Sequence, residues 1–333
     1  MTDQHPIDYF LEDMAYHGRS KRTRAAYERV LRDFEKSLEG TALDEVTHRD
    51  CLAWLSGLRE RAAESTVASY ASYLHRFYDY MNQVGTFQEN PMTLVMEELE
   101  EQIAQDPDRR DISVESMREF VGSIGHPLAR AVILTLLKTG MRAGELCNLD
   151  LRDVHLTEVE LSSGPIRPEL EGRPDSLFVS REPKQGRTIN GETRTDSNKR
   201  KRDTVIPIDE ELKAGLRHWL AIRPDSPSPA APLFVGTSRN WGRRLDGATV
   251  HHIVTERAAD WGWYERSGGA RHNVTPHYFR HFFTTHLRDR TGDRGVVKYL
   301  RGDVASDVID TYTHNWGGQV RSTYEQHIYS LLD

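Results

Sequence analysis

The chain has 333 residues, which at the usual size of one hydrophobic core is enough for about two domains. Its formal net charge of -7 argues against a uniformly basic nucleic-acid binder, although local patches can oppose the sign of the total. The two cysteines, Cys51 and Cys147, stand in unrelated contexts, which indicates neither a disulfide framework nor a thiolate metal site and favours a reducing cytosol. No apolar run approaches the roughly 18 residues of a membrane span and no signal-peptide layout opens the chain, so a cytoplasmic protein without a membrane anchor is expected.

Apolar side chains at helical spacing predict a small all-helical unit at the start of the chain. A lead-in helix is expected over residues 7–18, followed by a helix that Thr23 caps and a shorter one over residues 44–60. A fourth helix follows Ser65 and keeps the same spacing. The acidic stretch 94–111 shows no clear apolar face, which predicts a linker helix and a tether.

A second unit, mainly helical with a small sheet, is predicted from Ile112 onward. Residues 126–138 are almost entirely apolar, which indicates a buried helix, and Gly140 ends it. The stretches SLFVSRE and DTVIPID have the β-branched, alternating character of strands, and the polar insert between them, residues 184–202, predicts a long hairpin tip. Further helices are expected at three places: 210–222, 248–261 and 277–290.

Two short basic runs oppose the negative total charge. HGRSKRTR contains Lys21, Arg22 and Arg24, and NKRKR contains Arg200 and Lys201. Such cations can neutralise nucleic-acid phosphates and release their counterions, so these five residues are the candidate DNA-binding positions. The alternative is a solvated protein face, because most charge runs are no more than that.

Two motifs place arginine next to groups that can position it. In TGMRAGEL, Arg142 follows the apolar helix and Glu145 comes one helical turn later; the alternative role for Arg142 is a cap on the preceding helix. In TPHYFRHFF, the proline suits the first turn of a helix, so His277, Arg280 and His281 fall on one side. The HxxxH spacing also allows a zinc hydrolase, but the glutamate of a zinc protease is absent beside the first histidine, so no metal is expected.

These motifs belong to a longer series with a set order. Arg142 comes first, then a hairpin with lysines, His277-x-x-Arg280, a Leu-x-Gly step and Tyr312 in YTH. The series resembles the tyrosine recombinase, or phage integrase, family over about residues 20–314. The resemblance implies a site-specific recombinase that cuts and rejoins DNA strands through a 3′-phosphotyrosyl intermediate. It further implies double-stranded DNA as partner, a homo-oligomer that is a tetramer on DNA, and no cofactor.

The resemblance also specifies a fold and a domain division. The fold is expected to be mainly α with a small β-sheet. A helical, SAM-like core-binding domain that binds DNA is expected in residues 1–92 and a linker in residues 93–112. An α+β DNA breaking-rejoining catalytic domain is expected in residues 113–333.

Cleavage of a phosphodiester by an enzyme hydroxyl sets chemical requirements that residues of this chain can meet. It needs a nucleophile, neutralisation of the non-bridging oxygens and a proton for the departing 5′-oxygen. Arginine presents a planar fork that matches phosphate and does not lose its proton. Arg142 and Arg280 are therefore the candidate phosphate clamp, and Glu145 is expected to hold Arg142.

The resemblance makes Tyr312 the nucleophile. Tyr324 and Tyr329, in the amphipathic tail, are the alternatives. The tail itself, through Leu332, is expected either to exchange between neighbouring subunits or to pack on its own domain.

The general acid in this family is a lysine at a hairpin tip. Counting back from TVIPI along the second strand selects Lys199. Lys184 and Lys201 lie on the same insert, and both stay open as alternatives.

One position departs from the family pattern. Asp303 follows the Leu-x-Gly step where the family commonly has histidine or tryptophan, and a carboxylate repels phosphate oxygens. Either Asp303 faces Arg301 or an active-site arginine, or else His281 or His314 donates the hydrogen bond to phosphate that Asp303 cannot. His277 is expected to position the phosphate or to take part in transfer of the tyrosine proton. The departure also supports a rival reading, a non-cleaving DNA-binding or architectural protein that retains the recombinase fold.

Overall fold

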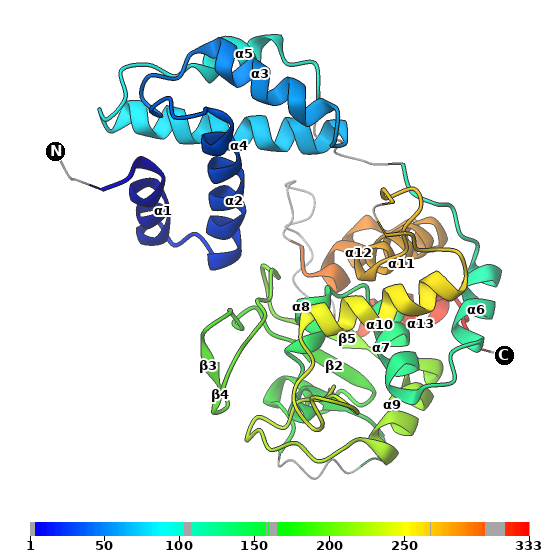
Figure 1. The fold of residues 1–333 in the computed structure, drawn as a ribbon. Coiled ribbons are helices and arrows are strands. Elements are labelled where there is room, and N and C mark those ends of the chain that lie inside the picture. The colour runs from blue at the N-terminus through cyan, green and yellow to red at the C-terminus, as the bar shows by residue number, and fades with distance from the viewer. Residues whose placement is uncertain are drawn as a thin grey trace. The chain divides into compact units, whose positions relative to one another are not determined.

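The computed structural model describes residues 4–102, 108–157, 159, 165–266, 268–303 and 317–332. The chain divides into two compact units, Met1–Pro107 and Asp108–Asp333, and each has its own hydrophobic core (Figure 1). In the described part of the chain, no helix has the length and apolar character needed to cross a bilayer.

The first unit is helical where it is described. Its helices are α1 (Pro6–Tyr16), α2 (Lys21–Ser37), α3 (His48–Arg59), α4 (Glu64–Gln83) and α5 (Met92–Glu98). Apolar residues at helical spacing on α2 and α4 face a shared core, in which Phe34 and Phe77 are fully buried. Several aromatic rings of this core meet edge to face, as Phe10 and Phe77 do with centroids 5.5 Å apart, an arrangement that aromatic quadrupoles favour.

Two expectations for this unit were wrong in detail. Helix α2 begins at Lys21 and its N-cap is Ser20, whose Oγ accepts the Thr23 N–H at 3.1 Å, so Thr23 lies inside the first turn. Both residues can cap a helix, and sequence spacing does not choose between them. Helix α5 lies in the stretch that was expected to be a linker, but it buries Met92 and Val95 against α3 and α4 and so belongs to the core of the first unit.

The second unit is built around one buried helix. Its described helices are α6 (Val114–Gly122), α7 (Pro127–Thr139), α8 (Ala143–Cys147), α9 (Glu210–Ile222), α10 (Gly247–Asp260), α11 (Pro276–Thr291), α12 (Arg294–Arg301) and α13 (Gly317–His327), with 3₁₀ turns at Leu151–Asp153 and Pro168–Leu170. Helix α7 contacts α9, α10 and α11, and this explains why nearly every residue in it is apolar. The buried helix and its end at Gly140 agree with the prediction, as does the mainly α fold with a small sheet.

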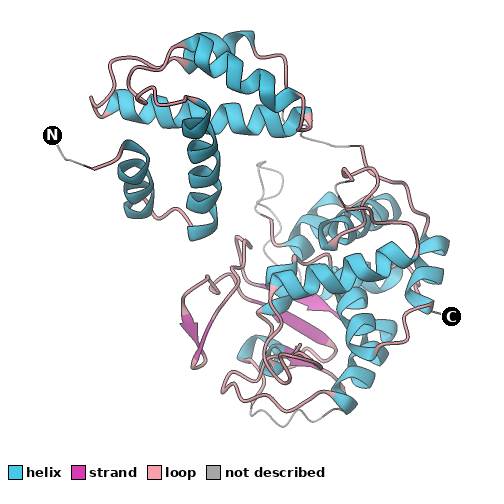
Figure 2. Cartoon of the chain, viewed as in Figure 1, coloured by secondary structure: helices cyan, strands magenta, loops and turns pink. Residues whose placement is uncertain are grey.

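The sheet lies to one side of these helices (Figure 2). Its strands β1 (Val154–His155), β2 (Ser176–Val179) and β5 (Thr204–Pro207) run antiparallel in the order β1-β2-β5. The insert between β2 and β5 carries a second pair, β3 (Thr188–Ile189) and β4 (Glu192–Thr193), joined through Asn190 and Gly191. Both turn residues have positive φ, 53° and 77°, as a two-residue hairpin turn requires.

The C-terminal tail is packed on its own unit. Tyr324, Tyr329 and Leu331 are fully buried, and the two phenols donate to carbonyls at the end of α7. The ammonium of Lys138, also fully buried, binds the Tyr329 carbonyl at 2.6 Å and the carboxylates of Asp209 and Glu211, both at 2.6 Å. In this structure the tail therefore takes the packed arrangement rather than the exchanged one.

The Lys138 network should contribute strongly to stability. Lys138→Ala leaves two carboxylates and a carbonyl without their cation, and we expect the free energy of unfolding of the second unit to fall by about 3 to 5 kcal/mol. The measurement is urea denaturation, with Arg294→Ala, at an exposed position on α12, as the control that changes stability by less than about 0.5 kcal/mol. A loss for Lys138→Ala no larger than that of the control would contradict this account.

Candidate active site

The two candidate arginines meet where α7 ends. Gly140 stops α7 with φ 61°, and a Cβ there would lie 2.3 Å from the Phe283 ring on α11, so only glycine lets the two elements approach this closely. Arg142 follows as the N-cap residue of α8, and Arg280 reaches across from α11 to donate to the Gly140 carbonyl at 2.7 Å. Gly140, not Arg142, caps α7, so the capping role considered for Arg142 is not what the structure shows.

The carboxylate of Asp303 forms ion pairs with both guanidinium groups. Arg280 Nη2 lies 3.1 Å from Asp303 Oδ1, and Arg142 Nη2 lies 3.5 Å from the same oxygen. Arg301 binds the other oxygen through Nε at 2.9 Å. Arg280 is only 3% exposed, and burial first, then the charges of Arg142 and Arg301, lower its pKa. Arg142 and Arg280 lie far apart in the sequence, and the structure thus brings both to the carboxylate of Asp303.

Glu145 supports the arginine cluster from its buried side. Its side chain is fully buried, and its carboxylate accepts from the Arg142 side chain at 3.1 Å and from the Arg142 backbone N–H at 3.0 Å. Arg200 contributes a further bond to Glu145, at 3.2 Å, and donates to the Leu300 carbonyl at 3.0 Å. Arg200 was expected to contact DNA phosphates, but it is 3% exposed and turned into the protein, so its role is to link Glu145 to α12.

The three lysines of the insert differ in their surroundings. Lys184 donates to the Asn198 carbonyl at 2.7 Å and so helps to close the insert on itself. Lys199 is exposed between two buried residues, Asn198 and Arg200, whose side chains fix the backbone on both sides. Lys201 is exposed as well, and its backbone N–H binds the Gly302 carbonyl at 3.1 Å. The anchored backbone next to Lys199 and Lys201 runs directly beside the end of α12.

His277 and Arg280 project from the same stretch of α11. The side chain of His277 is exposed, but desolvation by the surrounding protein first, then the charges of Arg109 and Arg280, lower its pKa from the ordinary value of 6.5. The imidazole is therefore neutral at pH 7. His281 lies near the Tyr278 ring, with centroids 6.5 Å apart. Among the residues that the structure describes, no group of three potential ligands is arranged to hold a metal ion.

The shift of the His277 pKa can be measured directly. In an NMR titration of the imidazole resonances, His277 should titrate below pH 6.5, and Arg280→Gln should move its pKa upward because one repelling charge is removed. Since the folded pKa lies below the unfolded one, the stability that His277 contributes is present above pH 6.5 and is lost as the pH falls. A His277 pKa at or above 6.5 would contradict the electrostatic description of the site.

The candidate nucleophile and one candidate histidine, Tyr312 and His314, lie outside the described residues. The rival phenols are described. Tyr324 donates to the Lys138 carbonyl at 2.9 Å and Tyr329 to the Leu137 carbonyl at 2.5 Å, and burial raises the pKa of both well above the ordinary tyrosine value. A fully buried, hydrogen-bonded phenol cannot reach a phosphorus atom, so neither rival is a nucleophile in this conformation.

Cations of the first unit gather on α2. Lys21 and Arg22 are exposed and Arg24 is partly exposed, and the first turn of α2 contains no acidic residue. Cations at a helix N-terminus oppose the helix dipole, so this placement costs stability and favours a role in anion contact. The structure thus leaves these three side chains accessible on the first turns of α2, and their contact with phosphates stays a prediction.

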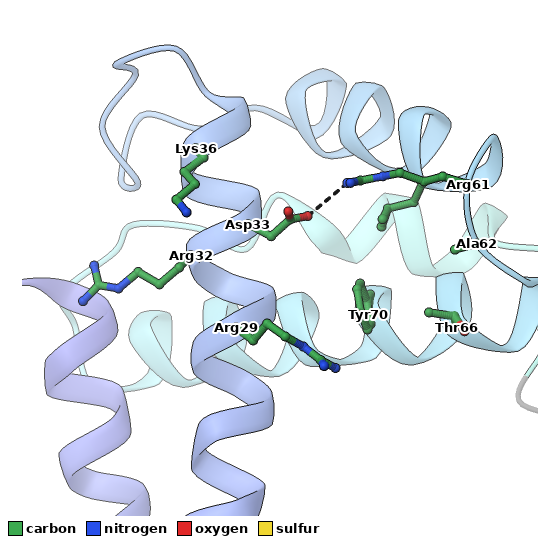
Figure 3. Close-up of a pocket in the computed structure, with 9 residues that line it drawn as sticks. Arg29, Arg32, Asp33, Lys36, Arg61, Ala62, Thr66 and Tyr70 are labelled. Carbon is green, nitrogen blue, oxygen red and sulfur yellow. Dashed lines mark hydrogen bonds and ion pairs between the residues drawn. The ribbon is translucent and has the colours of Figure 1, made fainter. Parts of the chain in front are cut away.

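A pocket of about 430 Å³ lies farther along the same helix, between α2 and the start of α4 (Figure 3). Arg29 points toward the Tyr70 ring, 6.0 Å from its centroid, and Arg61 pairs with Asp33 at 3.1 Å. Arg32 is turned away toward α1, where it binds Asp8 at 2.6 Å. Two of the cations that line the pocket, Arg32 and Arg61, therefore already have carboxylate partners.

The comparisons with known proteins agree with this site and fold. The model for the phage integrase N-terminal SAM-like domain matches residues 7–85, and the phage integrase family model matches residues 177–316. Tyrosine recombinase XerC of Vibrio vulnificus is 26% identical over 332 residues, which cover 96% of this chain and 90% of the relative.

Solved structures share the fold. The Tn1549 transposon integrase, in complex with transposon right end DNA, superposes with a TM-score of 0.66 and 18% identity over 97% of this chain and 99% of the other. A lambda integrase tetramer bound to a Holliday junction gives a TM-score of 0.62 and 16% identity over 91% and 77%. The chain therefore shares the fold of these integrases over most of its length. The chain belongs to the phage integrase family, the tyrosine recombinases.

Proposed function

We propose that the chain cuts and rejoins DNA strands at a specific site, with Arg142 and Arg280 holding the scissile phosphate and Tyr312 attacking it. The observation that carries the proposal is the convergence of both guanidinium groups on one carboxylate, because a phosphodiester has the same single charge and offers the same pair of oxygens. Glu145 keeps Arg142 in place from the buried side.

The chemistry balances without metal or nucleotide. The Tyr312 oxygen forms a bond to phosphorus as the bond to the 5′-oxygen breaks, and Lys199 supplies the proton that the departing oxygen takes up. In this proposal His277, whose pKa is lowered from 6.5, accepts the proton that Tyr312 loses as its oxygen attacks, and it also helps to position the phosphate. Attack by a 5′-hydroxyl of another strand then reverses these steps, and the phosphotyrosyl bond conserves the energy of the bond that was broken.

Double-stranded DNA is the proposed partner, bound by both units, and a tetramer is the proposed assembly on DNA. The support for the assembly is the shared fold with the lambda integrase that forms a tetramer on a Holliday junction. The division into a core-binding domain and a catalytic domain, and a cytoplasmic location, belong to the same proposal. Membership of a recombinase family argues against the rival reading of a non-cleaving DNA-binding protein.

Covalent capture tests this function. Fragments of the protein's own replicon, each carrying a nick that lets the released strand end diffuse away, should trap a covalent protein-DNA adduct with the purified chain. Peptide mapping by mass spectrometry should place the nucleotide on Tyr312, and sequencing of the trapped DNA gives the cleaved position. Failure to trap an adduct on any fragment would favour the non-cleaving rival, and an adduct on another tyrosine would refute the assignment of Tyr312.

The DNA contact of the first unit can be tested through salt. Changing Lys21, Arg22 and Arg24 to glutamine should reduce the slope of log affinity against log salt concentration by about 2 to 3, because each lost phosphate contact removes about 0.9. The matched comparison changes Arg29, Lys36 and Arg61, which line the pocket of Figure 3. If only the pocket variant reduces the slope, the first unit contacts phosphates through the pocket and not through the first turn of α2.

A further inference from the structure

The side chain of Asp303 occupies the position between Arg142 and Arg280 that the proposed function reserves for a phosphate. Its two oxygens bind three guanidinium groups, those of Arg142, Arg280 and Arg301. A carboxylate and a phosphodiester both carry one negative charge and both accept two parallel N–H bonds from arginine. The two anions cannot occupy this position together, since like charges in contact repel.

Backbone contacts at the end of α12 fix the position of Asp303 between the two arginines. Gly302 ends α12 with φ 69°, and a Cβ on it would lie 2.4 Å from the side chain of Arg200, so the turn passes directly over a buried guanidinium. The Asp303 N–H binds the Lys298 carbonyl at 3.1 Å, and the Gly302 carbonyl accepts from the Lys201 N–H at 3.1 Å. The carboxylate is thus fixed by the end of a helix, not by a loose loop.

The net charge of the cluster explains both why the Asp303 carboxylate stabilises the arginine pair and why a phosphate can displace it. Arg142, Arg200, Arg280 and Arg301 stand against Glu145 and Asp303, so four cations less two anions leave two positive charges among these described residues. Without the carboxylate of Asp303, Arg142 and Arg280 would face each other with no anion between them. The Asp303 side chain is 30% exposed, so an incoming phosphate can reach and replace it.

We infer that Asp303 is an internal competitor for the scissile phosphate. In the absence of DNA it holds the arginine pair, and a bound phosphodiester must displace it before cleavage. This inference rests on the proposed function for the identity of the displaced position.

The opposite role is a positioning residue that presents the arginines to phosphate. The two roles predict opposite effects of Asp303→Asn, which keeps the shape and removes the charge. A competitor predicts tighter phosphate binding, because a repelling charge in contact is gone. A positioning residue predicts weaker binding, because the guanidinium groups lose the anion that aligns them.

A calorimetric titration of the full-length protein with orthophosphate, in the absence of DNA, distinguishes the competitor role from the positioning role. We expect Asp303→Asn to bind phosphate at least about tenfold more tightly than the wild type, a modest part of the several kcal/mol that a like charge in contact can cost. Asp260→Asn, an equal charge change on α10 of the same unit, should leave phosphate affinity unchanged.

Asp303→Ala provides a second measurement if the asparagine variant does not fold. Phosphate affinity that is unchanged or weaker in the folded Asp303 variants, or an equal gain in Asp260→Asn, would overturn the inference. Because no DNA is cleaved in this titration, its result is independent of the covalent-capture experiment. A gain in phosphate affinity without any covalent adduct would refute the proposed function and leave the competition standing.

Discussion

Replacing Arg280 with lysine should lower the rate constant of DNA strand cleavage by about a thousandfold while DNA affinity stays within about threefold. Arg280 does several things at once: it donates to the Gly140 and Arg301 carbonyls, and its Nη2 reaches the anion position. A lysine keeps the charge but has one nitrogen, so it cannot hold these backbone contacts and a phosphate together.

The measurement is single-turnover cleavage of a nicked substrate, with DNA affinity taken from fluorescence anisotropy. Arg257→Lys, on α10 and paired only with nearby carboxylates in the described structure, is the control and should cleave at the wild-type rate. Circular dichroism would show that the Arg280 variant is folded. Cleavage by a folded Arg280→Lys variant within about tenfold of the wild-type rate would mean that the fork geometry is not used in the transition state.

Tyr312→Phe should abolish the covalent adduct completely, because the two rival phenols of the tail, Tyr324 and Tyr329, are fully buried and hydrogen-bonded to α7. Tyr324→Phe and Tyr329→Phe are matched controls, since each removes one hydroxyl from the same end of the chain. Both should retain the adduct, with stability lowered by about 1 kcal/mol for the lost hydrogen bond to α7. The readout is a denaturing gel of labelled DNA after incubation with each variant. Adduct formed by Tyr312→Phe at the wild-type level would require a different nucleophile.

The sequence predicts best those features that depend on local pattern. Residues 126–138 are almost entirely apolar, and the structure buries every residue of α7 except Pro127 and Arg130, which are partly exposed. The β-branched strands β2 and β5 likewise have short-range causes. Motif order, which depends on longer-range chemistry, was enough to identify the family and to select the two arginines that the structure brings to one carboxylate.

The features that sequence reasoning missed have distant partners. Lys138 is the basic residue in the last turn of an apolar helix, a position that usually faces solvent, yet it is fully buried on Asp209 and on the Tyr329 carbonyl, 71 and 191 residues away. Arg200 stands in a run of cations, and only the position of Glu145, 55 residues earlier, turns it inward. A charge run does not reveal which of its members is buried, because that depends on a partner that no local pattern contains.

Asp303 illustrates the same limit at the site itself. Its identity marked a departure from the family pattern, and one of the expectations was that it would face Arg301 or an active-site arginine. The structure shows that it binds Arg301 and both members of the pair, Arg142 and Arg280. What the sequence did not contain was the end of α12 that directs the carboxylate to this position.

The chemistry of the substrate shows whether the two guanidinium groups act on one phosphorus atom. A methylphosphonate at the cleaved position replaces one charged oxygen with a methyl group, so less positive charge is needed in the transition state. We expect the loss of cleavage rate in Arg142→Ala and in Arg280→Ala to be at least about tenfold smaller on this neutral linkage than on normal DNA. Equal losses on both substrates would show that the arginines do not touch the scissile phosphate and would refute the proposed phosphate clamp.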